Sequence, residues 1–583
     1  MDFTEGWDDT CSTVGLAARS GNLTELRRLI SEGRPVDVQD NRGWRPLHEA
    51  AAKGNDVGVV KELLKHESTD VDWVTYEGET ALLLACKRLK GNLLTEVISV
   101  LLESGADASI ADNERDSPLL AACRAKSADA VRLLLTKGGA DPNEGDCGGW
   151  HPLHEAASQG DLSTLRCLIG QGSAVLDVQD ECRMTPVFVA SQHGHLECLK
   201  CLLGAAEEAG NKSLVDVGAE DGATPLMIAV QNGHLNCMNF LLSRGADPDK
   251  RTTDNVTALH LAVQSNALDC LNVLLTRMDV QKFISGCLLT FQKRKRPYPG
   301  SPMLSPLHLA VDWGSHGCLQ ALLDAGFPVD GLLLSADLPA QRLPLGGPPR
   351  YETALCYAAL KQEIVSMEIL LAAGACPNAI SSETISPLSA ALTSPTGREL
   401  KLLLEHGAEL NYRREGCVPT NECLLVTIGD YNCLVRALRL GLDLRLCFGS
   451  DVDDDTEAAS IAPFLNSLFH QGQSQEHCLR VFWVLRVFMQ SQPVLQDIAS
   501  VAFRRAKTAF RSTVDTAAWV SLLNSLEQPL SLACQCRITT RRHLLSIHGN
   551  FFESAFLRMK LPSRVHDFLM YSELGLPDVW ASG

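Results

Sequence analysis

Apolar and polar positions follow one another in a long series of similar blocks that covers most of the chain. A typical block opens with Thr-Pro or Ser-Pro, continues with an apolar, alanine-rich run, and reaches a glycine turn. A leucine pair at helical spacing follows, and several blocks then close with Gly-Ala-Asp. Threonine caps a helix, proline is tolerated in the first turn, and glycine allows the left-handed end. The pattern therefore predicts two short helices in each block.

The blocks recur with a nearly constant step. RPLHEAAAKGN at 45–55 returns as HPLHEAASQGD at 151–161, and looser copies follow; most steps are 33 to 39 residues long. This period is typical of ankyrin repeats, in which no single unit buries enough surface and stacking provides the core. The units are expected to begin near Thr13, Pro46, Ala81, Pro118, Pro152, Pro186, Pro225, Ala258, Pro306, Ala354 and Pro387, with a degraded unit near Pro419.

The series divides the chain into three parts. We expect an all-α ankyrin solenoid of about 11–12 repeats over residues 9–447, interrupted by two longer steps. The insertion at 332–350 is rich in Pro and Gly and is expected to be an irregular loop. Residues 448–524 combine an acidic hinge with helical apolar periodicity, which predicts a helical adaptor. A terminal helical module is expected over residues 525–579.

The terminal module carries two helical patterns. Leu532 and Cys536 lie four residues apart and so share one helix face, which suits insertion into an apolar groove of a partner. The second pattern begins after Leu561-Pro562, where proline fits the first helical turn. The alternative is a C-terminal helix pair that caps the array, since solenoids need polar end caps.

The first pattern resembles the elongin-binding half of a SOCS box, with a small residue or Pro, Leu, three residues, Cys, three residues and an aliphatic residue. Leu530 and Cys534 fit one register of this motif, with aliphatic Ile538 at its end. Leu532 and Cys536 fit a second, which ends on Thr540. We prefer the second register because its Cys-Arg pair, completed by Arg537, is similar to the ankyrin-type members.

The second pattern resembles the cullin-binding half of the same module. Family members have Leu-Pro-aliphatic-Pro followed by an aliphatic and an aromatic residue at helical spacing. Met559 and Lys560 depart from this motif. The residues that match it, and that the resemblance implies for cullin binding, are Leu561, Pro562, Val565 and Phe568.

Together these features identify the chain as resembling the ankyrin repeat and SOCS box family. The resemblance implies a substrate-recognition subunit of an elongin–cullin–RING ubiquitin ligase. Its expected partners are elongin C, elongin B, a cullin-5-type scaffold with its RING partner, and an unidentified protein substrate bound by the repeats for ubiquitination and proteasomal degradation. The competing hypothesis is an ankyrin scaffold that binds proteins without recruiting a ligase.

The repeats offer two candidate contact residues for a target. Trp44 and Trp150 follow glycine at the junction between a finger-like turn and a first helix, and large aromatics are favoured hot-spot residues. The alternative is that each tryptophan packs onto the adjacent finger. The repeating histidines His48, His154 and His260, with His308, are expected to tie helix starts to neighbouring loops rather than to bind metal.

Composition argues against several other classes of protein. A net charge of −18 argues against nucleic acid, and no run of about 20 apolar residues predicts a membrane span. The acidic N-terminus lacks the features of a signal peptide, so the 21 cysteines are expected in a reducing, cytoplasmic setting as small core residues. Lys293–Arg296 is interpreted either as a solvated loop tip or as a nuclear import signal.

No motif for catalysis, a cofactor or a metal holds up in the sequence. Walker, dinucleotide-binding and His-Glu-x-x-His patterns are missing. Cys198 and Cys201 have no matching pair at zinc spacing, and the acidic hinge lacks the glycine and glutamate of a calcium loop. We therefore expect a non-catalytic adaptor without cofactors, whose ligase activity comes from its partners.

Overall fold

The computed structural model describes most of the repeat array. The described residues are 11–53, 56–254, 256–284, 305–330, 332–335, 350–379, 386–392 and 397–410, with isolated positions at Leu434, Ala437, Leu438, Leu442, Cys478, Val481 and Leu485. The terminal module, almost all of the adaptor, the unit near Pro419 and Lys293–Arg296 lie outside this description. The chain divides into two compact units, residues 1–278 and 279–583.

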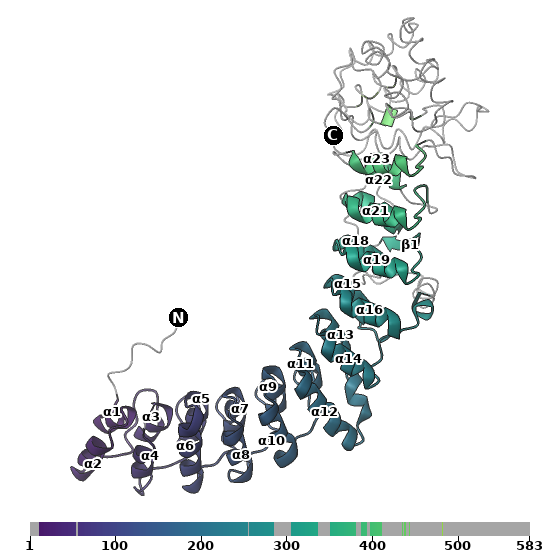
Figure 1. Cartoon of the computed structure of the whole chain (residues 1–583). Helices are drawn as coiled ribbons and strands as arrows, with labels where there is room; N and C mark the ends of the chain where they lie inside the picture. Colours follow the sequence, from purple (N-terminus) through teal and green to yellow (C-terminus); the bar gives the residue numbers. More distant parts are fainter. Residues whose placement is uncertain are drawn as a thin grey trace, which may run out of the picture. The chain divides into compact units, whose positions relative to one another are not determined.

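The first unit consists of eight helix pairs (Figure 1). The first helices are α1 (Thr13–Arg19), α3 (Pro46–Lys53), α5 (Ala81–Arg88), α7 (Pro118–Arg124), α9 (Pro152–Gln159), α11 (Pro186–Gln192), α13 (Pro225–Gln231) and α15 (Ala258–Gln264). The second helices are α2 (Leu23–Ser31), α4 (Val57–Leu63), α6 (Gly91–Glu103), α8 (Ala128–Thr136), α10 (Leu162–Gly172), α12 (Leu196–Glu208), α14 (Leu235–Ser243) and α16 (Leu268–Arg277). A 3₁₀ turn, η2 (Lys212–Asp216), follows α12.

The second unit repeats the same motif in its described part. Its helix pairs are α18 (Pro306–Asp312) with α19 (His316–Asp324), α20 (Ala354–Lys361) with α21 (Ile364–Ala372), and α22 (Pro387–Leu392) with α23 (Arg398–Glu405). In both units each first helix packs against the next first helix, and each second helix against the next second helix. Every start expected from the sequence between Thr13 and Pro387 is the first residue of a first helix, which confirms the ankyrin solenoid.

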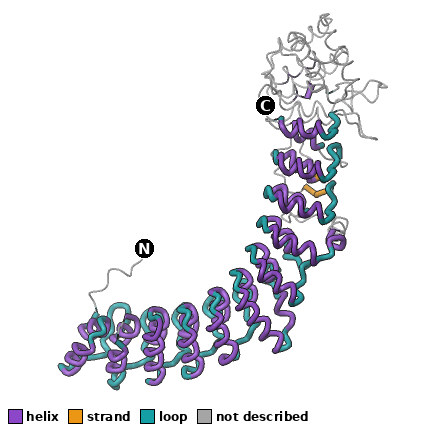
Figure 2. Tube along the Cα trace, in the orientation of Figure 1, coloured by secondary structure: helices purple, strands orange, loops and turns teal. Residues whose placement is uncertain are grey.

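The insertion at 332–350 differs locally from its prediction. Instead of an irregular loop throughout, its ends form two antiparallel strands, β1 (Leu332–Ser335) and β2 (Arg350–Thr353), shown in orange in Figure 2. Leu332 pairs with Thr353 and Ser335 with Arg350. Backbone pairing across the base of the insertion satisfies polar groups that would otherwise need water. The expectation of an irregular loop is therefore wrong for the two ends of this segment, and residues 336–349 lie outside the described residues.

The helix starts are fixed by side-chain caps. The hydroxyl of Thr80 accepts a hydrogen bond from Leu83 N at 3.2 Å, and Ser117 does the same for Leu120 N at 3.2 Å. Both caps are buried, so the hydroxyl oxygen satisfies a backbone N–H that water cannot reach.

The finger-like turns between units are also joined to one another. In each pair a backbone N–H of one finger donates to a carbonyl oxygen of the finger before it, over 2.8–3.1 Å. These bonds fix the register of equivalent positions in successive units. The donor and acceptor pairs are Tyr76 to Arg42, Asn113 to Glu77, Cys147 to Glu114, Glu181 to Gly148, Glu220 to Cys182 and Thr253 to Asp221.

The core is built from small residues on the first helices and leucines on the second helices. Ala51 and Leu63 are fully buried, and full burial of a leucine contributes about 1.5–3 kcal/mol. Several cysteines, among them Cys86 and Cys198, belong to the same core, as expected. Burial raises the pKa of the Cys198 thiol to about 11, so this cysteine stays protonated at neutral pH. Among the described helices, none is long and apolar enough to cross a membrane.

The repeating histidines have the structural role that the sequence predicted. His48 Nε2 lies 2.9 Å from the carbonyl oxygen of Trp73 in the next unit, and His154 Nε2 lies 2.9 Å from that of Met184. In each, Nδ1 accepts from a backbone N–H at the start of its own helix. Burial lowers the pKa of His48 and lowers that of His154 to about 4, so both rings are neutral at physiological pH.

Candidate protein-binding surface

A group of buried and half-buried ion pairs lies where the fingers meet the ends of the first helices in the first five units. The last turn of the first helix places Arg19, Lys87 and Arg124 at equivalent positions. In the sixth to eighth units the same position holds glutamine: Gln192, Gln231 and Gln264. The charge of this surface is therefore concentrated toward the N-terminal half of the first unit.

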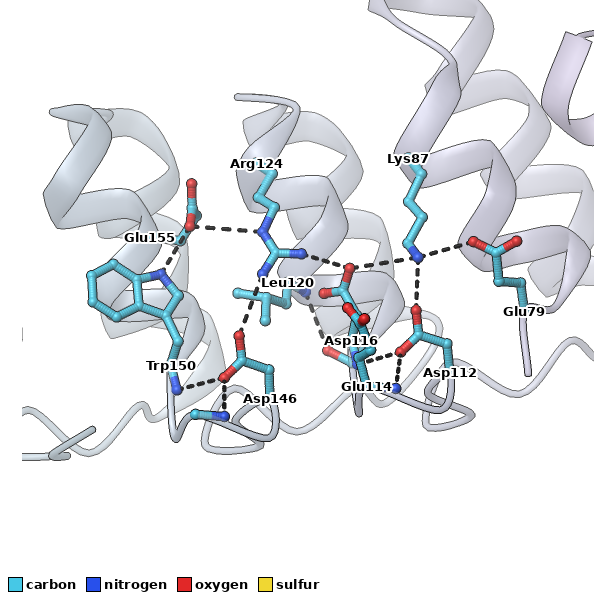
Figure 3. A network of polar contacts seen from close by, with 12 residues as sticks. Glu79, Lys87, Asp112, Glu114, Asp116, Leu120, Arg124, Asp146, Trp150 and Glu155 are labelled. Atoms are coloured by element: carbon cyan, nitrogen blue, oxygen red, sulfur yellow. Dashed lines mark hydrogen bonds and ion pairs between the residues drawn. The ribbon is translucent and has the colours of Figure 1, made fainter. Parts of the chain in front are cut away.

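Lys87 links two neighbouring fingers (Figure 3). Its Nζ donates to Glu79 at 2.9 Å and to Asp112 at 2.7 Å, and it lies 3.8 Å from Asp116. All three carboxylate side chains are only 7% exposed. Burial alone would lower the pKa of Lys87, but its hydrogen bonds to Asp112 and Glu79 outweigh this effect and raise it. Lys87 is therefore a permanent cation at neutral pH.

Arg124 continues the network into the fifth unit. Its Nη1 donates to Asp116 at 2.6 Å and its Nη2 to Asp146 at 3.4 Å, while Nε lies 3.8 Å from Glu155. Desolvation raises the pKa of Asp116, although Arg124 and Lys87 oppose the shift. Five carboxylates thus share two cations. We call this set of carboxylates, Glu79, Asp112, Asp116, Asp146 and Glu155, the acidic ladder.

A separate cluster surrounds Glu49 in the second unit. Glu49 is 1% exposed and accepts two hydrogen bonds from Arg19, at 2.8 and 2.9 Å. Arg42 Nη2 donates to both Glu49 and Asp40 at 2.6 Å. Two arginines from different units therefore neutralise one buried carboxylate. This arrangement attaches α1, the first helix of the array, to α3 and its finger.

The structure gives the two candidate tryptophans different surroundings. Trp44 is 6% exposed and packs with Ala52 and Leu84, with the guanidinium carbon of Arg42 4.4 Å from its ring centroid. This burial favours the packing alternative for Trp44. Trp150 is partly exposed, and its role in target binding, like that of Trp44, stays a prediction.

Trp150 is held in place by two contacts. Its Nε1–H donates to Glu155 at 2.8 Å, and its ring stacks on His154 with centroids 5.1 Å apart and planes 28° apart. Figure 3 shows Glu155 above the indole and the Asp146 carboxylate beside the Trp150 backbone nitrogen. Trp150 is thus an oriented aromatic ring at the end of the acidic ladder.

Sequence reasoning missed the acidic ladder. Glu79 and Asp116 occupy the same finger position as Trp44 and Trp150. In each unit this position lies two residues before the first residue of the first helix. Aligning that one position across the second to fifth units would have revealed two acidic residues, Glu79 and Asp116, between two tryptophans. The signal is positional and has no local motif.

The residues predicted for elongin and cullin binding lie outside the described residues, so their roles stay predictions. They are Leu530, Leu532, Cys534, Cys536, Arg537, Leu561, Pro562, Val565 and Phe568. Within the described part of the chain, no group of three or more His, Cys, Asp or Glu side chains is arranged to hold a metal ion.

Comparison with known proteins agrees with this architecture. The family model for ankyrin repeats (three copies) matches residues 14–112, 89–177, 153–252 and 188–285. Ankyrin repeat and SOCS box protein 3 from Homo sapiens is 47% identical over 121 residues, which are 20% of this chain and 22% of the relative. The Bos taurus protein of the same name is 46% identical over 121 residues. The match thus spans about a fifth of the length of these curated relatives.

Among solved structures, the human ASB11 ankyrin repeat domain is 25% identical in sequence, with a TM-score of 0.32. The match covers 44% of this chain and 97% of that domain. The chain is an ankyrin-repeat protein, and it is similar to proteins of the ankyrin repeat and SOCS box family. Within that family, the similarity found is to its third member.

Proposed function

We propose that this protein is the substrate-recognition subunit of an elongin BC–cullin–RING ubiquitin ligase and acts in the cytoplasm. The repeat array binds a target protein, and the terminal module at 525–579 recruits elongin C, elongin B and a cullin-5-type scaffold through the adaptor at 448–524. The chain itself performs no chemistry in this proposal. It raises the local concentration of target lysines near ubiquitin carried by its partners.

The observation that carries this proposal is the combination of two features in one chain. The array is an ankyrin solenoid with a charged surface on its fingers. A stretch of 121 residues is similar to a protein named for an ankyrin repeat and a SOCS box. The segment at 529–571 resembles such a box, with Met559 and Lys560 departing from the cullin-binding pattern. In the competing scaffold hypothesis, this segment would serve only as a C-terminal cap of the array.

Co-purification with elongins B and C tests the proposal. Wild-type protein is compared with a Leu532→Ala, Cys536→Phe double variant. Loss of a buried leucine removes about 2–3 kcal/mol and the larger Phe clashes, so binding should fall at least about tenfold. The matched control is Leu530→Ala, Cys534→Phe, which changes the same residue types two positions earlier.

The outcomes separate the hypotheses. Loss of elongin in the first variant but not in the control supports the preferred register. The reverse result supports the other register and leaves the function intact. A wild-type chain that does not bind elongin favours the scaffold alternative. If elongin binds, Leu561→Ala with Phe568→Ala should release the cullin while elongin stays bound.

A further inference from the structure

The fingers of the second and fifth units have the same hydrogen-bonding pattern. Asp40 and Asp146 each accept a hydrogen bond from the backbone N–H of the tryptophan four residues later, at 2.8 and 2.9 Å. The carbonyl oxygen of each tryptophan accepts in return from its aspartate N–H, at 2.8 and 3.1 Å. Each unit also has a glutamate three residues after the proline that begins its first helix. These are Glu49, after Pro46, and Glu155, after Pro152. The second and fifth units thus present the same aspartate, tryptophan and glutamate.

The second unit shows which side chain this set of residues accommodates. The guanidinium of Arg42 donates to Asp40 and to Glu49 at 2.6 Å, and its central carbon lies 4.4 Å from the Trp44 centroid. Arg88 from the next unit lies over the same ring at 5.5 Å. An aspartate, a glutamate and an indole therefore form one binding site for an arginine side chain, and here the chain fills it with its own arginines.

The fifth unit keeps the aspartate, the tryptophan and the glutamate, and Arg124 pairs with its two carboxylates as Arg19 pairs with Glu49, but the two arginines that cover the ring in the second unit have no counterpart. Gly148 stands at the finger position of Arg42, and His193 stands at the helix position of Arg88. Among the described residues, no lysine or arginine lies over the Trp150 ring. Arg124 approaches only from the preceding unit, at 3.4 Å from Asp146 and 3.8 Å from Glu155.

The carboxylates and the ring are also more accessible here than in the second unit. The side chains of Asp146 and Glu155 are 18% and 14% exposed, against 2% and 1% for Asp40 and Glu49. Trp150 is partly exposed, whereas Trp44 is buried. Asp146 and Glu155 are thus paired with Arg124, and Glu155 also accepts from Trp150 Nε1 at 2.8 Å, but their exposed oxygens and the exposed part of the indole remain accessible to a side chain from another molecule.

We propose that Trp150, Asp146 and Glu155 bind an arginine side chain of the target protein, in the place that Arg42 takes at Trp44. This inference rests on the proposed function only in treating the array surface as the target-binding surface. Arginine fits better than lysine because its planar guanidinium can stack on an indole while donating to two carboxylates. Lysine carries a compact charge that cannot do both at once.

The chain offers a way to fill the site from within. A Cβ atom added at Gly148 would meet only Asp146 Oδ1, at an ordinary 3.5 Å, and Gly148 does not have a positive φ. Gly148→Arg should therefore reproduce the arrangement of Arg42 and exclude an external arginine. Cys182→Arg is the matched control, because it adds the same charge at the same exposed finger position of the next unit. There Met184 stands in place of the tryptophan and Val189 in place of the glutamate.

The test follows the indole N–H signals of the full chain by NMR, in which 8 tryptophans give few, separable peaks. The Trp150 signal is assigned with a Trp150→Phe variant. The probe is the peptide acetyl-Gly-Arg-Gly-amide at up to about 20 mM, since one stacked and paired side chain binds in the millimolar range. The same peptide with citrulline, which is neutral but similar in shape, and with lysine are the comparison probes.

The expected result is a saturable shift of the Trp150 signal with the arginine peptide, no shift with citrulline, and at least about fivefold weaker binding of lysine. Gly148→Arg should move the signal without ligand and abolish the response, while Cys182→Arg should leave it unchanged. The proposal is overturned if Trp150 does not respond in the wild type, if lysine binds equally well, or if a folded Gly148→Arg protein still responds. Elongin binding plays no part in this measurement. A negative result here therefore contradicts the arginine site and leaves the ligase proposal to its own test.

Discussion

Replacing Glu49 by alanine should loosen the first repeat from the rest of the array. Glu49 is 1% exposed and connects Arg19 of α1 with Arg42 of its own finger. Without the carboxylate, two guanidinium groups remain close together without a shared counter-ion. Because each unit of a solenoid contacts only its neighbours, the effect should be confined to the N-terminal end.

The size of the effect follows from burial. Removing one partner of a buried ion pair costs about 3–5 kcal/mol. The side chains of Arg19 and Arg42 are 17% and 32% exposed, so water recovers part of this and we expect about 3 kcal/mol. Glu155 provides the comparison: it is 14% exposed, its arginine lies 3.8 Å away, and the Nε1–H that it accepts at 2.8 Å belongs to a partly exposed indole, so Glu155→Ala should cost only about 1 kcal/mol.

Hydrogen–deuterium exchange measures this difference locally. With Glu49→Ala, the amides of α1 should exchange about 100-fold faster, because 1.4 kcal/mol corresponds to a factor of ten in the opening equilibrium. With Glu155→Ala, the amides of α9 should change by less than about tenfold. Unchanged exchange in α1, or a larger effect from Glu155→Ala, would refute the assignment of Glu49 as the main link between the first two units.

Three further perturbations test the packing of the array. Burial lowers the pKa of His154 to about 4, below the 6.5 of an exposed histidine. About 3 kcal/mol of folding stability should therefore be lost as the pH falls from 6.5 to 4. Thermal melting of the His154→Gln variant over the same pH range should show a smaller loss. Gly160→Ala would place a methyl carbon 2.6 Å from the His195 ring, and should lower the urea midpoint more than Gly233→Ala, which has a similar φ but open space. Trp44→Ala empties a buried site and should cost about 3–5 kcal/mol, measured as a lower Tm.

The repeat boundaries could be predicted from the sequence because they depend on local chemistry. A Thr or Ser cap with Pro in the first turn starts a helix wherever it occurs, and the hydroxyl of Thr185 does bind Phe188 N at 3.2 Å. The histidine contacts could be predicted for the same reason, since their spacing repeats with the units. Pairing of β1 with β2 could not, because it depends on a return of the chain after a long insertion.

The charged surface depends on which units are neighbours in space. Lys87 meets Asp112, 25 residues further on, and only the register between fingers brings the two together. The surroundings of the two tryptophans likewise depend on which residues lie next to them in space. Trp44 and Trp150 lie in nearly identical sequences, but Arg42 covers one ring and Gly148 leaves the other partly exposed. Sequence similarity alone therefore could not separate a packing role from a binding role.

Reconstituted self-ubiquitination tests the central proposal most directly. The full chain is combined with elongins B and C, a cullin-5 scaffold with its RING partner, a ubiquitin-activating enzyme, a ubiquitin carrier and ubiquitin. A substrate receptor should become ubiquitinated on its own lysines in the complete mixture, and the Leu532→Ala, Cys536→Phe variant should not. If the wild-type chain binds elongin but acquires no more ubiquitin than this variant, the ligase-receptor function is contradicted and a binding scaffold is the better account.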